Sequence, residues 1–185
     1  MLDDDEEWRP TPSSLNNKKS RKTTKNNASS SSSPPTPSPP QSSPTPPVLP
    51  EEFKNHMREL NGGGSEMQFV MSKNLSKTDV SAKHNRLSMP QSEICCDFLT
   101  EAEKATLHER EGRLLRGVEV KVLDPSFREH TLILKRWEMT STSIYSLNKE
   151  WKSVVSQNRL QEGDQLQIWS CRVDAQLFLL LNKLI

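Results

Sequence analysis

Prolines and aromatic residues are divided unevenly along this 185-residue chain. Eleven of the 13 prolines fall within residues 1–50, whereas eight of the ten aromatic residues lie from Met67 onward. A chain folds only where its apolar side chains are dense enough to be buried together. We therefore predict a disordered Ser/Pro-rich tail over residues 1–66 and one folded domain over residues 67–185. The Asn-Gly-Gly-Gly-Ser run at 61–65 marks the boundary.

The predicted tail contains a basic cluster at residues 18–25, which reads KKSRKTTK. Short Lys/Arg-rich runs in flexible segments are typical of sites read by nuclear import receptors, and they also occur as ordinary solvated charge runs. Residues 29–50 are almost wholly Ser, Pro and Thr, which favours an extended linker. Phe53, Met57 and Leu60 then follow at helical spacing, which is compatible with a short helix.

Alternation of apolar and polar residues predicts that the folded domain is mainly β. Val118, Val120 and Val122 alternate with charged residues, as a half-buried strand requires. The same period-2 pattern and β-prone composition recur along the rest of the domain. Strands are predicted at residues 67–72, 86–89, 118–123, 129–137, 143–147, 165–170 and 176–181, and helices at residues 91–109 and 148–155.

The longer predicted helix, residues 91–109, contains two further signals. Thr100 and Glu103 have the spacing of a capping box, which leaves open a division into two helical pieces. Cys95 and Cys96 fall on an apolar face of that helix, which favours buried cysteines over reactive ones.

Two polar loops between apolar runs contain the side chains best suited to recognition. The first extends from Lys73 to Pro90 and reads KNLSKTDVSAKHNRLSMP. Cations mixed with short hydrogen-bonding side chains suit phosphates and base edges, although a solvated hairpin loop has a similar composition. The second extends from Trp137 to Trp151, reads WEMTSTSIYSLNKEW, and precedes a Glu-Gly-Asp turn.

In order and spacing, these two segments resemble the plant B3-type DNA-binding domain. The resemblance covers about residues 67–185. The family pattern Lys-x-Leu-Ser/Thr-x-Ser/Thr-Asp-Val, followed by Arg-Leu-x-x-Pro, is met by Lys73, Leu75, Ser76, Thr78, Asp79, Val80, Arg86, Leu87 and Pro90. Its later half is met by Asp124, Trp137, Ser141, Tyr145, Leu147, Trp151, Val155, Leu160, Gly163 and Asp164.

The resemblance implies a seven-stranded open β-barrel, the B3 pseudobarrel, with two short helices. Trp151, Val154 and Val155 are expected to seal one end of the barrel. Gly163 is expected to adopt a positive φ in the turn before the sixth strand, where Asp164 accepts hydrogen bonds from backbone amides.

The resemblance also implies sequence-specific binding of double-stranded DNA and transcriptional regulation in the nucleus. In B3-type domains two loops grip the major groove as jaws. Here the first jaw is residues 76–86 and the second jaw is residues 137–143. We expect cations to contact phosphates and Arg86, His84 and Asn85 to read base edges. The expected contacts in and beside the first jaw are Lys73, Ser76, Lys77, Thr78, Lys83, His84, Asn85 and Arg86.

The second jaw offers hydroxyls and methyl groups in place of cations. Trp137 is expected to anchor its base, and Lys135 and Arg136 to reach the DNA backbone. The expected contacts in and beside this jaw are Lys135, Trp137, Thr140, Ser141, Thr142 and Ser143.

Charge leaves a second interpretation open. Residues 67–185 contain 17 Lys and Arg against 15 Asp and Glu, a balance of +2, whereas DNA-binding domains are often strongly basic. Glu138 places a carboxylate in the second jaw, and Glu150 stands where the family usually has Gly before the Trp. The alternative function is therefore a degenerate B3-fold module that binds other proteins, with weak or no DNA binding.

Other classes of function are not supported by the sequence. The three cysteines and four histidines show no zinc-ligand spacing, and no nucleophile–base set recurs at useful spacing. We expect no enzyme activity, cofactor, metal or small-molecule substrate, and no membrane segment. The expected partners are double-stranded DNA and, through the tail, transcriptional co-regulators.

Overall fold

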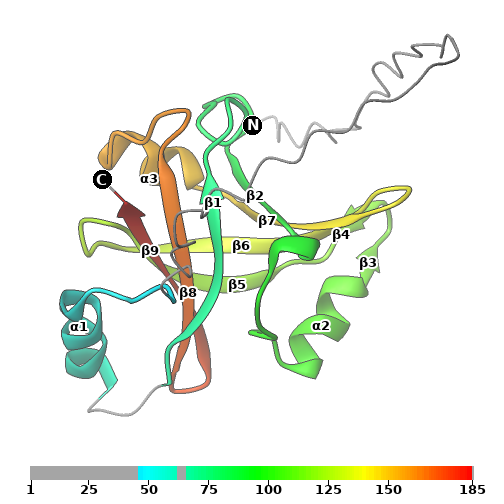
Figure 1. The fold of residues 1–185 in the computed structure, drawn as a ribbon. Coiled ribbons are helices and arrows are strands. Elements are labelled where there is room, and N and C mark those ends of the chain that lie inside the picture. Colours follow the sequence, from blue (N-terminus) through cyan, green and yellow to red (C-terminus); the bar gives the residue numbers. More distant parts are fainter. Residues whose placement is uncertain (1–45, 62–65, 185) are drawn as a thin grey trace, which may run out of the picture. The chain divides into compact units, whose positions relative to one another are not determined.

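A seven-stranded sheet forms most of this computed structural model, which describes residues 46–61 and 66–184 of the chain (Figure 1). The strand order is β1-β8-β9-β5-β6-β7-β2, and all neighbours are antiparallel except β5 and β9. Each strand corresponds to one of the seven predicted. Their bounds are β1 (Gln68–Asn74), β2 (Arg86–Pro90), β5 (Val118–Leu123), β6 (Glu129–Glu138), β7 (Ser143–Asn148), β8 (Gln165–Val173) and β9 (Gln176–Leu184).

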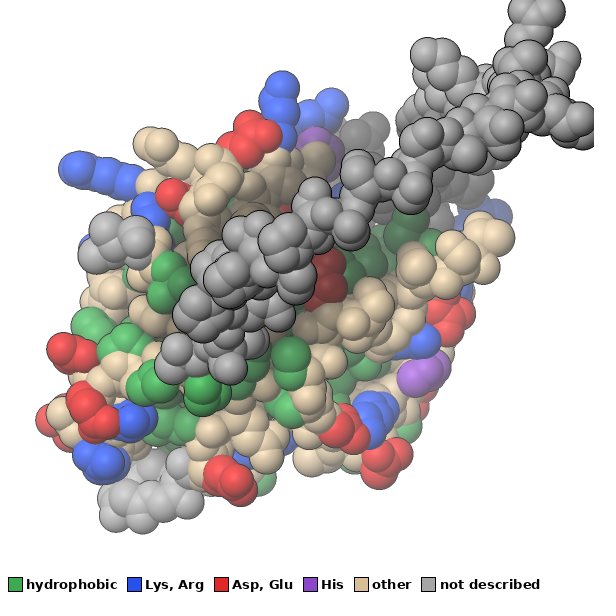
Figure 2. Space-filling view, viewed as in Figure 1, with side chains coloured by type: hydrophobic (Ala, Val, Ile, Leu, Met, Phe, Trp, Pro, Cys, Tyr) green, Lys and Arg blue, Asp and Glu red, His purple; other side chains and the backbone are tan. Residues whose placement is uncertain are grey.

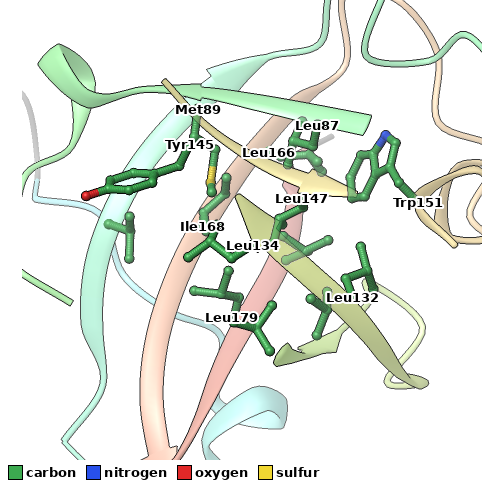
Figure 3. Close-up of a cluster of buried hydrophobic side chains, with 14 of the residues drawn as sticks. Leu87, Met89, Leu132, Leu134, Tyr145, Leu147, Trp151, Leu166, Ile168 and Leu179 are labelled. Atoms are coloured by element: carbon green, nitrogen blue, oxygen red, sulfur yellow. The ribbon is translucent and has the colours of Figure 1, made fainter. Parts of the chain in front are cut away.

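The sheet curves until its two edge strands, β1 and β2, contribute to the same core. Val70 on β1 and Leu87 on β2 are fully buried in one cluster with side chains from the other five strands (Figure 3). Because alternate residues of each strand point inward, the apolar half of the alternating pattern fills the interior. Burying one such side chain stabilises the fold by about 1.5–3 kcal/mol. The predicted open β-barrel is confirmed.

Helix α3 (Trp151–Gln157) seals one end of this core, as predicted. Trp151 and Val154 are fully buried, and Val155 packs against the same cluster. Gly163 has a φ of +90°, and the carboxylate of Asp164 accepts a hydrogen bond from the Gln161 amide at 2.8 Å. Both predicted turn residues are therefore confirmed.

The segment predicted as one helix over residues 91–109 is divided. It forms a single 3₁₀ turn, η1 (Gln91–Glu93), and then helix α2 (Glu101–His108). The Thr100 capping box is present, with bonds of 3.2 and 2.8 Å to and from Glu103. Between the two pieces the Cys95 amide donates to the Val70 carbonyl oxygen at 2.7 Å, so the chain follows β1 there.

The prediction that both neighbouring cysteines are buried on a helix is therefore wrong. Cys95 is exposed and Cys96 is half-buried, because the segment that contains them is not helical.

A short hairpin follows α2 and was not predicted. It consists of β3 (Arg110–Glu111) and β4 (Leu114–Leu115). Gly112, the first of its two turn residues, has a φ of +64°, the conformation that a tight two-residue hairpin of the Gly-X kind needs. Two-residue strands are too short to show alternation, so the Gly-Arg pair at 112–113 was the available signal.

Helix α1 (Glu51–Asn61) packs on the outer face of β8 and β9. Phe53 and Met57 are almost fully buried there, in a second cluster with Trp169 and Phe178. This is the short helix with which the spacing of the apolar residues Phe53, Met57 and Leu60 was compatible. The packed part of the chain extends upstream to Leu49, so the boundary expected at Met67 lies inside the packed unit. Residues 1–45 of the tail predicted over residues 1–66 lie outside the described residues.

Candidate nucleic-acid interface

Asp79 organises the first jaw from within. Its buried carboxylate accepts hydrogen bonds from the amides of Ser76 (2.9 Å) and Ser88 (3.0 Å), and from the Ser76 hydroxyl (2.6 Å). The ammonium of Lys73, near the end of β1, lies 3.3 Å from the same carboxylate. Since one carboxylate bonds residues on both sides of the loop, the backbone of the first jaw is fixed without any partner.

Helix α3 braces the first jaw from behind. The indole N–H of Trp151 donates to the Asp79 carbonyl oxygen at 2.7 Å. The side-chain oxygen of Asn85 accepts from the amide of Lys152, also at 2.7 Å, and so caps the first turn of α3. A bidentate contact to adenine uses both the oxygen and the nitrogen of an Asn side chain. The oxygen of Asn85 is therefore committed to α3 in this structure.

The structure separates the residues predicted around the first jaw by exposure. Lys77, Thr78 and Lys83 are exposed, whereas His84 is half-buried. The side chain of Lys73 is only 12% exposed and faces Asp79. The predicted site thus contains a solvent-facing set and an internal framework.

The second jaw is a hairpin turn with few internal bonds. The Met139 amide donates to the Thr142 carbonyl oxygen at 2.7 Å, and residues 138–142 are all exposed. Glu138 pairs with Arg136 at 2.5 Å, so much of its charge is matched within the jaw. The Ser143 hydroxyl donates to Gln91 of η1 and ties the base of the jaw to the body of the domain.

The pKa of the Glu138 carboxyl lies below its ordinary value. The main cause is the hydrogen bond and charge of Arg136, with smaller contributions from His108 and Arg110. The carboxylate that Glu138 places in the second jaw is therefore stabilised in its ionised form, mainly by Arg136.

A polar surface on the outside of the barrel connects the two jaws. Leu87, Leu134 and Leu147 point into the core, so by alternation Arg86, Lys135 and Asn148 point outward. Arg86 pairs in register with Asn148.

Ser146 joins two members of this outer surface. Its hydroxyl accepts from the Trp137 indole at 3.0 Å and from the Asn148 amide at 2.7 Å. Ser146 and Asn148 were not predicted as site residues. Their alternation was visible in the sequence, but the pairing of β7 with both β2 and β6 was not.

Arg86 lies at the junction of the first jaw and this surface. It begins β2 and is 9% exposed. Burial lowers the pKa of its guanidinium, and the neighbouring Asp79 opposes that shift. Arg86 is thus held at the edge of the polar surface, not extended from the tip of a loop.

The two jaws lie at opposite ends of the β2–β7 pair (Figure 1). Arg86 of the first jaw pairs with Asn148 at the end of β7, whereas Ser143 of the second jaw begins β7. Five residue steps at about 3.3 Å each separate these ends by about 17 Å. The major groove of B-DNA is about 12 Å wide. The distance between the two jaws is therefore enough to span the groove and to reach the phosphate backbones that border it.

Two cations at the start of α3, one just before the helix and one in its first turn, extend the charged surface beside the first jaw. Lys149 and Lys152 are exposed, and the Lys152 backbone is bonded directly to the jaw through Asn85. Figure 2 shows Lys and Arg side chains projecting at the top of the view, where the first jaw and α3 lie. Glu150, where the family usually has Gly, has a left-handed φ of 43°, which explains the usual preference for Gly.

Among residues 46–61 and 66–184, the His, Cys, Asp and Glu side chains form no cluster of three or more suited to a metal ion. Every helix in this part of the chain is too short or too polar to cross a bilayer.

Comparisons with known proteins agree with the motifs. Residues 46–184 match a family model described as B3 domain-containing protein At2g31720-like. B3 domain-containing protein At2g31720 of Arabidopsis thaliana is 40% identical over 126 residues, covering 66% of this chain and 40% of that protein. B3 domain-containing protein At1g05920 of the same plant is 34% identical over 139 residues, covering 70% of this chain and 43% of that protein. The chain thus spans less than half the length of these curated relatives.

Two solved structures are similar over 64% of this chain. They are an Arabidopsis FUS3–DNA complex, at 20% identity, a TM-score of 0.42 and 100% coverage of that chain, and an Arabidopsis thaliana LEC2–DNA complex, at 21% identity, a TM-score of 0.46 and 96% coverage. The family model matches well over half of the chain and includes both jaws, α1 and α3. The chain therefore belongs to the family of B3 domain-containing proteins like At2g31720.

Proposed function

We propose that this domain binds double-stranded DNA by sequence, with its two jaws in the major groove, and that it regulates transcription in the nucleus. One observation carries the proposal. Two loops, one with free cations and one with free hydroxyls, stand at opposite ends of a strand pair whose outer surface is polar. Phosphate contacts and base-edge contacts require these two kinds of side chain.

In this proposal, phosphates and bases are contacted by different exposed residues. Lys77 and Lys83 of the first jaw, with Lys149 and Lys152 beside it, hold the phosphates of one DNA strand. Lys73 has a different role, because its ammonium faces Asp79: it positions the first jaw.

Base reading falls to the outer surface and the second jaw. Arg86 and Asn148 lie beside each other on the sheet, and Arg suits guanine while Asn suits adenine. The side-chain amide of Asn148 donates to Ser146 in this structure, so Asn148 must exchange that bond for one to a base. Thr140, Ser141 and Thr142 offer hydroxyls for base edges, and the Thr methyl groups suit the methyl group of thymine.

The alternative is a B3-fold module that binds other proteins. Exposed Met139, 42% accessible at the tip of the second jaw, and the ionised Glu138 beside it favour a protein partner over phosphate. The test of DNA binding decides between the two.

The tail supplies localisation in this proposal. The basic cluster at residues 18–25 is the import signal, and the Ser/Pro-rich segment upstream of Leu49 is the region through which co-regulators are reached. A fluorescent fusion of the full chain is expected in the nucleus, and replacing the cations of the cluster by Gln is expected to spread it through the cell.

The experiment that tests DNA binding is selection of random duplexes by the full chain at near-physiological salt. We expect one enriched motif. The affinity for that duplex is then measured at several salt concentrations, where each phosphate contact contributes about −0.9 to the slope of log K against log salt. An enriched motif with a steep slope supports the proposal, whereas no enrichment from a folded protein supports the protein-binding alternative.

A matched pair of variants tests the assignment of cations. Lys77→Gln with Lys83→Gln is expected to lower affinity and flatten the salt slope by about 2. Lys54→Gln with Arg58→Gln removes the same charge from α1 and is expected to leave both unchanged. Equal effects of the two pairs would show that net charge, not the first jaw, sets the affinity.

A further inference from the structure

The β3–β4 hairpin lies against the second jaw, although it follows α2 in the chain. In Figure 1, β3 and β4 lie beside the β6–β7 hairpin that forms this jaw. Gly117, just after β4, is so close to β6 that an added Cβ would lie 2.3 Å from Ile133 and 3.2 Å from Lys135. Val118, the next residue, pairs with Leu134, so the chain leaving the hairpin enters the sheet directly beside β6.

Two cations of the hairpin are free for a partner. Arg110 and Arg113 are exposed, and among the residues that the structure describes neither forms an ion pair or a side-chain hydrogen bond. Arg116, just beyond β4, differs from them because it is paired with Glu109 at 2.5 Å. Figure 2 shows His and Lys or Arg side chains among acidic ones at the right of the view, where α2 and the hairpin lie in Figure 1.

Glu111, the acidic residue of the hairpin itself, lies on the face opposite Arg110. Glu111 pairs in register with Leu114, whereas Arg110 pairs with Leu115, so the two side chains lie on opposite faces of the hairpin. Because β4 contacts β6, the hairpin that contains Arg110 lies near the second jaw, and the charge of Arg110 contributes to the lowered pKa of the Glu138 carboxyl there.

The charge of the interface is otherwise one-sided. Four exposed lysines lie in the first jaw and at the start of α3, whereas the two cations beside the second jaw, Lys135 and Arg136, are half-buried and the charge of Arg136 is matched by Glu138. A duplex held in a major groove has a phosphate backbone on both sides of that groove. A clamp with cations at one end would hold only one of the two backbones.

We propose that the β3–β4 hairpin is a third element of the DNA interface, in which Arg110 and Arg113 bind backbone phosphates beside the second jaw. The inference rests on the proposed DNA-binding function. It assigns the segment between β2 and β5, which contains the hairpin, a contact with the DNA backbone. Phosphate contacts do not select a sequence, so the hairpin adds affinity and salt dependence and leaves the enriched motif unchanged.

The test compares variants of the full chain on the selected duplex over a range of salt. Arg110→Gln with Arg113→Gln is expected to flatten the slope of log K against log salt by about 2, with the selected motif unaltered. Arg110→Lys with Arg113→Lys keeps the charge and is expected to retain the slope. The control is again Lys54→Gln with Arg58→Gln, and melting curves confirm that every variant is folded.

The outcomes separate the two proposals. Binding by the unaltered chain with the same slope in the Gln variant overturns the role of the hairpin and leaves DNA binding intact. A changed motif in the Gln variant also overturns it, because it would show base reading instead of phosphate contact. Absence of duplex binding by the unaltered chain overturns both.

Discussion

The two jaws differ in how they are held. The first jaw is bonded internally through Asp79, whose carboxylate accepts from two backbone amides and a hydroxyl and pairs with Lys73. The second jaw has one backbone bond across its turn, and its other contacts are at its base. The first jaw is therefore pre-organised, whereas the second is free to adjust.

The difference suits two tasks in one interface. A fixed loop holds cations at a set spacing, which matches the regular spacing of phosphates and avoids the cost of ordering the loop on binding. A loosely held loop with hydroxyls adapts to base edges, whose positions vary with sequence. We therefore expect changes in the first jaw to alter stability and affinity together, and changes in the second to alter mainly binding, with at most a small effect on stability.

The largest effect is expected from Asp79→Ala. The variant leaves the Ser76 and Ser88 amides without their acceptor and Lys73 without its counter-charge. Removing one partner from a buried pair costs about 3–5 kcal/mol. Urea unfolding monitored by tryptophan fluorescence measures the loss.

Thr140→Ala in the second jaw is the control for that experiment. Thr140 is exposed and forms no side-chain hydrogen bond among the described residues. The urea unfolding midpoint of the Thr140→Ala variant is therefore expected to match that of the unaltered protein. If Asp79→Ala were equally harmless, the first jaw would not depend on its carboxylate and the contrast between the jaws would fail.

A smaller effect is expected from Asn85→Gly. This change removes the cap that Asn85 provides to the Lys152 amide but allows the left-handed φ of 43°. Loss of one such hydrogen bond costs about 0.5–1.5 kcal/mol. Thermal unfolding measures the loss, and affinity for the selected duplex is expected to fall with it because α3 supports the first jaw.

Asn85→Asp separates the cap from base reading. An aspartate also caps a helix, so stability is expected to be retained, whereas a carboxylate in the jaw repels phosphate and weakens DNA binding. Retained affinity in Asn85→Asp would place Asn85 away from DNA.

Features that depend on local sequence patterns were predictable, whereas features that depend on contacts between distant segments were not. The seven strands were predictable because alternation is a local signal, and Trp151 and Gly163 because their roles depend on burial and on one φ angle. The two loops were predictable because polar stretches interrupt apolar runs, whereas their designation as jaws came from the resemblance to B3-type domains.

The framework of the first jaw was not predictable in this way. Lys73 was expected to bind phosphate, but its contact with Asp79 joins β1 to a residue inside the loop and leaves no trace in periodicity. Ser146 and Asn148 became site residues only through the register of β7 with its two neighbours. Sequence patterns gave the residue types suited to DNA, and tertiary pairing decided which of them face outward.

In the second jaw, Thr140→Ala with Ser141→Ala is expected to change binding without changing stability. Each lost hydrogen bond to a base edge is worth about 0.5–1.5 kcal/mol, a two- to tenfold loss of affinity. Repeating the duplex selection with this variant is expected to relax the motif at the positions that the second jaw reads. An unchanged motif would assign base reading to the outer surface of the sheet alone.

The smallest effect concerns pH and compares a carboxylate at the base of each jaw. Asp164, whose carbonyl accepts from the Leu75 amide next to the first jaw, has a lowered pKa, mainly because Lys183 donates to it at 2.7 Å. A folded pKa below the unfolded value of about 3.9 means that the ionised group stabilises the fold above that pH and that this contribution disappears as pH falls through the folded pKa.

Asp164→Asn is therefore expected to lower the free energy of unfolding at pH 7 by less than about 1 kcal/mol, with the difference from the unaltered protein closing below about pH 4. Glu138→Gln tests the second jaw, where Arg136 lowers the pKa of an exposed carboxyl. Its difference has the same sign, but it is expected to be smaller and to vanish in 1 M salt, because solvent and ions screen an exposed pair. Urea unfolding at pH 7 and pH 3 measures both. A larger pH-dependent difference for Glu138→Gln than for Asp164→Asn would show that the second jaw is the more tightly held of the two and reverse the comparison.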